Sequence, residues 1–177
     1  MQVGQNDIRS SSVPVVDDAS WKVLDIRLYL HNVGGIRSQL ASVRSAVLSC
    51  EYDVIVLVET WFNKTVLSTE LFDPKDWVVF RCDRCDCGDD REGGGVLIAV
   101  RLKLCPSPLD DPYAGDIELT WEKLSTKRGT IFIGATYIAP GSNDNYYDQL
   151  LQSTTAVTTL AGPTDHVFLL GDFNRRG

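Results

Sequence analysis

The stretch VFLLGDFN at residues 167–174 decides the fold, because it leads an apolar strand directly into two polar side chains. Residues 167–170 are all apolar, which predicts a short strand beginning at His166. Asp172 and Asn174 follow at the C-terminal end of that strand, where a backbone turn would expose both side chains. A carboxylate and an amide two residues apart at a strand end are suited to holding a metal-bound phosphate.

Apolar runs and helical spacing alternate along the rest of the chain. The run DVIVLV at 53–58 predicts a strand covered on both faces, whereas 36–50 carries apolar residues at helical spacing. Asn143 is placed to cap a second helix. The predicted strands are 24–33, 53–58, 77–81, 96–101, 117–124, 130–137 and 166–170, and the predicted helices are 36–50, 144–161 and a short piece at 66–72. This alternation favours an α/β domain with layered, mixed sheets.

Composition sets the broad class of the protein. A chain of 177 residues with 44% hydrophobic and 23% charged residues fits one globular domain. We expect a disordered lead-in at 1–22 and the domain at 23–177. No apolar run approaches the ~20 residues that span a bilayer, and the polar N-terminus lacks a signal-peptide core, so we expect an intracellular protein without membrane contact. The net charge of −7 is not typical of a nucleic-acid-binding protein, which usually carries a basic face.

Polar side chains end four of the predicted strands. They are Asn32, Glu59, Tyr137 and the pair Asp172 and Asn174. Any one of them has an equally good structural role as a polar cap on the sheet, but ligands of layered α/β folds bind at such strand ends. Together they suit phosphodiester hydrolysis, in which Glu59 holds Mg²⁺ and Asp172 orients or deprotonates a water molecule. The amide and phenol groups would donate hydrogen bonds to phosphate oxygens.

Six stretches, in order along the chain, resemble the endonuclease/exonuclease/phosphatase superfamily. They are LYLHNVGGIRSQL at 28–40, YDVIVLVETWF at 52–62, VVFRCDR at 78–84, GGGVLIAV at 93–100, TYIAP at 136–140 and VFLLGDFN at 167–174. Within the superfamily, the sequence resembles the N-terminal endonuclease domain of jockey-like non-LTR retrotransposons. The resemblance implies a layered sandwich of two mixed β-sheets flanked by helices. It also implies DNA as the partner, Mg²⁺ (or Mn²⁺) as the metal and no small-molecule cofactor.

The resemblance also assigns roles to the matching positions. It implies that Tyr137, Asp172 and Asn174 are catalytic. It places Glu59 and Asn32 on the metal side, and it gives Asn32 and Asn174 contacts with the substrate. The expected reaction is Mg²⁺-dependent nicking of DNA by the endonuclease of a non-LTR retrotransposon, which would act in the nucleus if the element is intact.

The end of the sequence departs from the family pattern. The family continues past GDFN through further strands to a Ser-Asp-His motif. The two histidines of this sequence, His31 and His166, do not stand in that position. We therefore expect the fold to lack its C-terminal strands, with apolar surface and strand edges left exposed. We also expect the nicking activity to be weak or absent in this chain.

Two other functions stay open at this point. The chain is alternatively a catalytically dead retroelement remnant that serves as a DNA-binding module, or a superfamily phosphatase or phosphodiesterase acting on a non-nucleic-acid substrate. Cys82, Cys85 and Cys87 suit a zinc site in their spacing but lack a nearby fourth ligand, so a loop between strands is the simpler interpretation. Trp61 fits either packing at the edge of the site or stacking against DNA.

Overall fold

The protein is described by a computed structural model over residues 25–174, except residues 50, 64, 85–92 and 111–116. Its described part contains eight β-strands and two α-helices, which confirms the predicted α/β class. In chain order these are β1 (Leu28–Asn32), α1 (Ile36–Leu48), β2 (Val54–Val58), β3 (Trp77–Cys82), β4 (Val96–Arg101), β5 (Pro106–Pro108), β6 (Glu118–Thr126), β7 (Gly129–Tyr137), α2 (Asp144–Leu160) and β8 (His166–Asp172). The expected lead-in at 1–22 and two members of the cysteine cluster, Cys85 and Cys87, lie outside the described residues.

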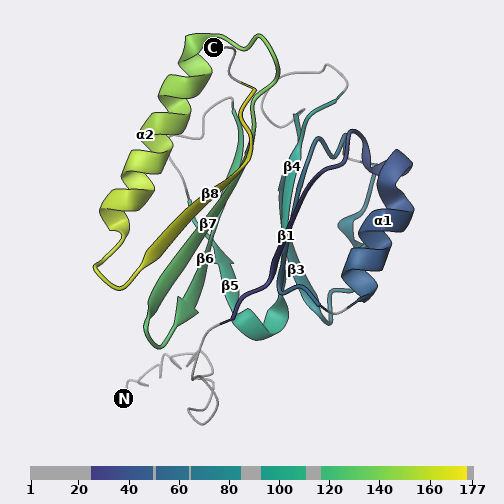
Figure 1. Ribbon diagram of the computed structural model, residues 1–177, viewed down its shortest axis with the longest axis horizontal. Coiled ribbons are helices and arrows are strands. Elements are labelled where there is room, and N and C mark those ends of the chain that lie inside the picture. The colour runs from purple at the N-terminus through teal and green to yellow at the C-terminus, as the bar shows by residue number, and fades with distance from the viewer. Residues whose placement is uncertain (1–24, 50, 64, 85–92, 111–116, 175–177) are drawn as a thin grey trace, which may run out of the picture.

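The strands form two mixed sheets of four strands each. The first sheet has the order β1-β2-β4-β3, and the second has the order β5-β6-β7-β8. β1 is parallel to β2 and β7 is parallel to β8, whereas the other neighbouring strands are antiparallel. Both parallel pairs end at the same end of the molecule, at the top of Figure 1. The carboxyl ends of four strands therefore meet at one end of the sandwich.

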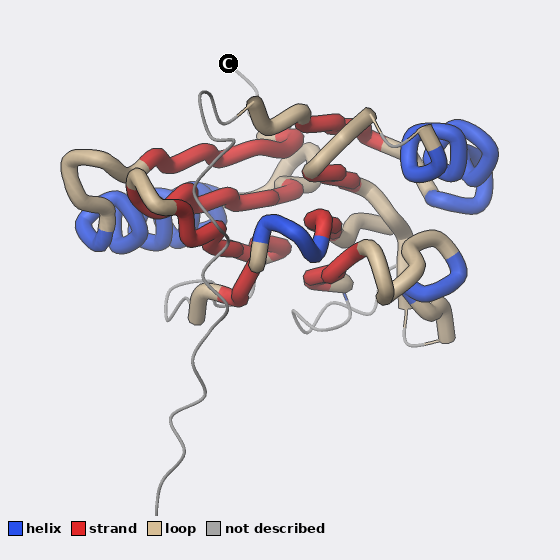
Figure 2. Tube along the Cα trace, turned by 90° about the horizontal axis from the view of Figure 1, so that it is seen from below, coloured by secondary structure: helices blue, strands red, loops and turns tan. Residues whose placement is uncertain are grey.

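Two sheets pack face to face, and one helix covers the outer face of each (Figures 1 and 2). β2 is buried along its whole length because its two faces enter two different apolar clusters. Ile55 and Leu57 pack in the cluster with α1, while Val54, Val56 and Val58 pack between the sheets. A third cluster lies between the second sheet and α2. The expectation of a strand covered on both faces is confirmed.

Some element boundaries differ from the sequence-based prediction. The short helix predicted at 66–72 is a single 3₁₀ turn, η1 (Ser68–Glu70). The three-residue strand β5 was not predicted, because two of its residues are prolines, which usually argue against a strand. β5 is an edge strand, the one place in a sheet that tolerates proline well. None of the described helices is long and apolar enough to cross a membrane.

β1 and β8 are each an edge strand of their sheet, and they contact each other along one side of the sandwich. Side chains that face the space between the sheets are partly open to solvent there. Leu30 is 42% exposed and Phe168 is 50% exposed. β1 and β8 therefore each carry a partly exposed apolar side chain on this side of the sandwich.

Arg81 holds the loop that follows β2 in place. Its guanidinium donates to the carbonyl oxygens of Val66 (2.8 Å) and Asn63 (2.9 Å), pairs with Asp83, and lies 4.7 Å from the centre of the Phe62 ring. Because one planar cation contacts two carbonyls and a carboxylate, it joins the loop to the end of β3. The loop that Arg81 anchors begins directly after β2, at Glu59.

Candidate active site

The ends of three strands bring three polar side chains into direct contact. The Asn32 side-chain nitrogen, at the end of β1, donates to Glu59 Oε1 (3.0 Å), just past β2, and to Asp172 Oδ2 (3.0 Å), at the end of β8. The Asn32 oxygen accepts a hydrogen bond from the backbone N–H of Gly34 (3.1 Å). That last bond fixes the orientation of the amide, because an oxygen must face the N–H of Gly34. One amide nitrogen therefore holds two carboxylates from different sheets.

Tyr137 is the fourth member of this group. It ends β7 opposite Asp172 in the parallel pair and is only 6% exposed. Burial, followed by the charge and hydrogen bonding of Glu59, raises the pKa of Tyr137 to about 12. The phenol therefore keeps its proton at neutral pH and acts as a hydrogen-bond donor.

Asn174 lies two residues beyond Asp172 and takes a left-handed backbone conformation with φ of 37°. The tyrosine hydroxyl of Tyr147 on α2 donates to the carbonyl of Phe173 (3.0 Å), which ties this turn to the helix. Within the residues that the structure describes, the Asn174 side chain forms no hydrogen bond with the other four predicted site residues. The structure thus joins Asn32, Glu59, Tyr137 and Asp172 and leaves Asn174 at their margin.

Glu59 is held in a strained backbone conformation. Its φ of 56° lies in the left-handed region, which costs an ordinary residue about 1–3 kcal/mol. The carbonyl of Glu59 accepts from Gly35 N–H (2.8 Å), and the next two residues donate to the carbonyls of Gly95 (3.2 Å) and Gly94 (2.9 Å). Strain of this kind persists only where surrounding structure enforces it, as it does at many functional sites. Gly94 and Gly95 therefore support the turn that carries Glu59.

A model of the endonuclease/exonuclease/phosphatase family matches residues 30–176 of this chain. The chain belongs to this family. Members of the endonuclease/exonuclease/phosphatase family are hydrolytic nucleases and phosphatases that generally use divalent metal ions. The resemblance drawn from the six sequence stretches is confirmed at the family level. No curated protein matches the sequence significantly.

Solved structures share the same fold. The endonuclease domain of TRAS1, a telomere-specific non-LTR retrotransposon, is 15% identical with a TM-score of 0.59, and the match covers 86% of this chain and 62% of that one. The 3′ phosphatase NExo from Neisseria, bound to a product DNA hairpin, is 16% identical with a TM-score of 0.58, covering 85% and 58%. The AP endonuclease LMAP from Leishmania major is 18% identical with a TM-score of 0.59, covering 83% and 54%. These likenesses show the fold, and this chain spans less than two thirds of each of those proteins.

The candidate site of this family member has donors that fit a divalent cation. Mg²⁺ binds oxygen ligands, usually one or two carboxylates with several waters retained. Glu59 and Asp172 supply two carboxylates that face the same nitrogen atom of Asn32. Asn32 itself presents its N–H groups to them, so in this arrangement it orients the carboxylates and does not offer an oxygen to a metal. The described residues contain no group of three or more histidine, cysteine, aspartate and glutamate side chains that could hold a metal ion.

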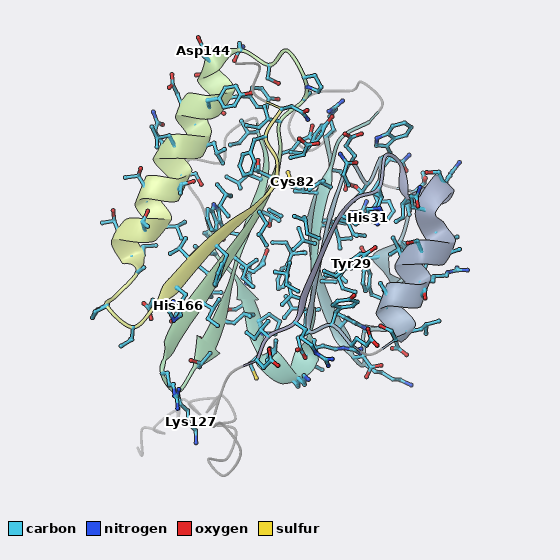
Figure 3. All side chains as sticks on the ribbon, viewed as in Figure 1. Tyr29, His31, Cys82, Lys127, Asp144 and His166 are labelled. Atoms are coloured by element: carbon cyan, nitrogen blue, oxygen red, sulfur yellow. The ribbon has the colours of Figure 1, made fainter. Side chains whose placement is uncertain are left out.

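Both histidines lie apart from these strand ends. His31 precedes Asn32 on β1, but its side chain is on the α1 face, where Nδ1 is 2.9 Å from the Tyr29 hydroxyl (Figure 3). His166 begins β8, six residues before Asp172, which is about 20 Å along a strand. Figure 3 shows His166 at the end of the sandwich opposite the site. Neither histidine was given a role from the sequence, and neither contacts the candidate site.

Sequence reasoning missed an ion pair beneath the site. Arg84 Nε donates to Glu118 Oε1 (2.7 Å), and the other oxygen of Glu118 accepts from Gly95 N–H. The Arg84 guanidinium also lies 5.7 Å from the centre of the Tyr137 ring. Both charged residues line a cavity of about 240 Å³ beside Tyr137. The sequence contains little indication of this pair, because a glutamate at the start of an apolar strand usually marks only the boundary of the strand.

Proposed function

We propose that this domain nicks DNA by Mg²⁺- or Mn²⁺-dependent hydrolysis of a phosphodiester bond, as the endonuclease of a non-LTR retrotransposon. The observation that carries the proposal is the single Asn32 nitrogen that holds Glu59 and Asp172 together at the ends of strands from two sheets. This arrangement does not favour stability, because it places two carboxylates, which repel each other, side by side at the protein surface. It is a good way to bind a cation and a phosphate.

Each residue of the site has a role in the proposed reaction. Glu59 is the metal ligand, and a bound metal would polarise a phosphoryl oxygen and offset the charge that develops on it. Asp172 orients a water molecule toward phosphorus and takes its proton. Tyr137 and Asn174 donate hydrogen bonds to phosphate oxygens, and Asn32 keeps both carboxylates in place. The water oxygen bonds to phosphorus as the bond from phosphorus to the 3′-oxygen breaks, and the 3′-oxygen takes a proton from solvent, so that the nick leaves a 3′-hydroxyl and a 5′-phosphate.

Several lines of support favour DNA over other phosphodiesters. The fold is shared with proteins whose structures contain DNA, namely the Neisseria phosphatase with a DNA hairpin and a zebrafish TDP2 with a single-stranded DNA product. The retrotransposon assignment rests on the FRCDR and GGGVLIAV stretches and on the shared fold of the TRAS1 domain. As part of an intact element, the domain would act on chromosomal DNA in the nucleus.

A supercoiled-plasmid nicking assay tests the proposal. Because we expect a low rate from this sequence, the incubation is long: a small but measurable fraction of supercoiled plasmid should become open-circular in Mg²⁺, and none should do so in EDTA. Asp172→Ala should lower the rate about 10²–10³-fold, as expected when a group that acts on the transition state is removed. Asp148→Ala, an exposed aspartate on α2, is the matched control and should leave the rate unchanged. DNA binding in a gel shift without any metal-dependent nicking would instead identify a binding module.

A further inference from the structure

Trp61 presents an exposed indole next to the candidate active site. It follows Glu59 by two residues, and 51% of its surface is open to solvent. The two other tryptophans that the structure describes, Trp77 and Trp121, are 3% and 2% exposed. An exposed indole at the edge of a site offers a flat apolar surface that a bound ligand can cover.

The backbone holds Trp61 in a fixed position. Its φ of 54° is in the left-handed region, and its N–H donates to the Gly94 carbonyl (2.9 Å). The neighbouring Phe62 is 5% exposed and lies under the Arg81 guanidinium. The segment is therefore anchored on both sides of the exposed ring, and the strain in its backbone is balanced by these contacts.

The indole of Trp61 packs against the backbone at Gly35. A Cβ atom at Gly35 would lie 2.8 Å from Cε3 and 3.0 Å from Cδ2 of Trp61, so the ring packs directly against the glycine backbone. The φ of 92° at Gly35 is also one that other residues rarely adopt. The ring is thus supported by the turn between β1 and α1, and its Nε1 edge lies near Gly93, where an added Cβ would be 3.6 Å from Nε1. About half of the residue, 51%, stays open to solvent. A supported, half-exposed aromatic ring loses little conformational freedom when a flat partner binds to it.

We propose that Trp61 stacks on an unpaired base of the nucleotide that borders the phosphate bound at the candidate site. Every nucleobase has an aromatic face, so such a platform binds DNA with little preference for sequence. Stacking also suits this chain, whose net charge of −7 limits the attraction it can gain from phosphates. The inference rests on the proposed function, because it names the substrate contact that accompanies hydrolysis at the same site.

Direct binding measurements test the stacking contact separately from hydrolysis. Fluorescein-labelled single-stranded DNA is titrated with the protein in EDTA, so that no cleavage occurs. Trp61→Ala should weaken binding roughly five- to 150-fold, which is the range for loss of one base–aromatic stack. Trp61→Phe should retain most of the affinity, because it keeps an aromatic face. Leu67→Ala is the matched control, since Leu67 is 61% exposed in the same loop and should not contribute.

Salt dependence and base position give two further measurements. The ratio of affinities between the wild-type protein and Trp61→Ala should stay constant as salt is raised, because stacking releases no counterions. With 2-aminopurine placed at successive positions of the oligonucleotide, one position should be quenched by the wild-type protein and not by Trp61→Ala. The effect of Trp61→Ala should be smaller on a fully paired duplex, in which the base must first be unstacked.

The outcomes separate this inference from the proposed function. Equal binding by wild-type protein, Trp61→Ala and Trp61→Phe, without position-specific quenching, would overturn the stacking role even if Mg²⁺-dependent nicking is observed. An equal loss of affinity in Leu67→Ala would also overturn it, because the effect would then belong to the loop as a whole. If the wild-type protein neither binds nor nicks DNA, the proposed function and the stacking role fail together.

Discussion

The buried carboxyl group of Glu122 should make the stability of the protein depend on pH. This group is on β6 and faces the space between the sheets, and the residue is only 1% exposed. One carboxyl oxygen accepts a hydrogen bond from the Thr120 hydroxyl (2.9 Å), while the other has no partner among the described residues. Burial raises the pKa of Glu122 from 4.5 to about 8, against the lowering effect of Thr120. Glu122 is therefore protonated and neutral at pH 7.

The sign and size of the effect follow from this pKa. In the unfolded chain Glu122 ionises near pH 4.5, whereas in the folded protein it keeps its proton up to about pH 8. Its contribution is fully present below pH 4.5 and is lost as the pH rises through the folded-state pKa, because only the unfolded state has released the proton in between. Each pH unit in this window lowers the free energy of unfolding by about 1.4 kcal/mol, to a total of about 5 kcal/mol. That total is comparable to the whole stability of many domains.

Substitution of Glu122 by glutamine isolates this effect. Glutamine has nearly the same shape and does not ionise, so Glu122→Gln should remove the dependence on pH without opening a cavity. Urea unfolding followed by tryptophan fluorescence at pH 5, 6, 7 and 8 gives the free energy of unfolding for both proteins. The difference between them should change steadily in favour of Glu122→Gln as the pH rises. A difference that stays constant across this range would show that the carboxyl ionises normally and that the reasoning from burial is wrong.

The remaining predictions concern single positions in the fold and the site. Gly94→Ala should destabilise the protein by about 2 kcal/mol more than Gly141→Ala in urea unfolding, because an added Cβ at Gly94 collides with Glu118 whereas the space around Gly141 is open. Asn143→Ala should cost about 1 kcal/mol, since its side chain accepts from the Tyr146 N–H at the start of α2, and Asn143→Asp should recover that loss. Tyr137→Phe should lower the nicking rate about 10²-fold with no change between pH 6 and 9, because the phenol titrates only near pH 12. A rate for Tyr137→Phe that approaches the wild-type rate between pH 6 and 9 would contradict this role.

The regular elements of the fold were predictable because their signals are local. β2 and β4 are apolar runs, and the start of α2 follows directly from Asn143. The sequence also predicted which polar residues follow the strands. The structure places four of the five predicted site residues in contact. The parallel pairing of β1 with β2 and of β7 with β8 explains this result, since it aligns their C-terminal ends.

The features that the sequence did not reveal depend on contacts between distant segments. Arg84 and Glu118 are far apart in the chain, and only the packing of the two sheets makes them a pair. The left-handed conformations of Glu59 and Trp61 have no local cause, because neither residue type favours them. Hydrogen bonds from distant segments hold this turn: Gly35 N–H donates to Glu59, and the N–H groups of Thr60 and Trp61 donate to Gly95 and Gly94. The orientation of the Asn32 amide is likewise set by the Gly34 N–H. For these reasons sequence reasoning placed Asn32 among metal ligands, whereas the geometry favours a positioning role that we propose here.

The most direct measurement compares plasmid nicking by two glutamate variants of the same chain. Glu59→Gln changes the carboxylate that Asn32 holds, and Glu51→Gln changes an exposed glutamate outside the site. The account predicts that Glu59→Gln nicks supercoiled plasmid at least about 10²-fold more slowly than wild-type protein in Mg²⁺, while Glu51→Gln nicks at the wild-type rate. Equal nicking by both variants, or wild-type nicking that persists in EDTA, would contradict a metal-dependent site built on Glu59.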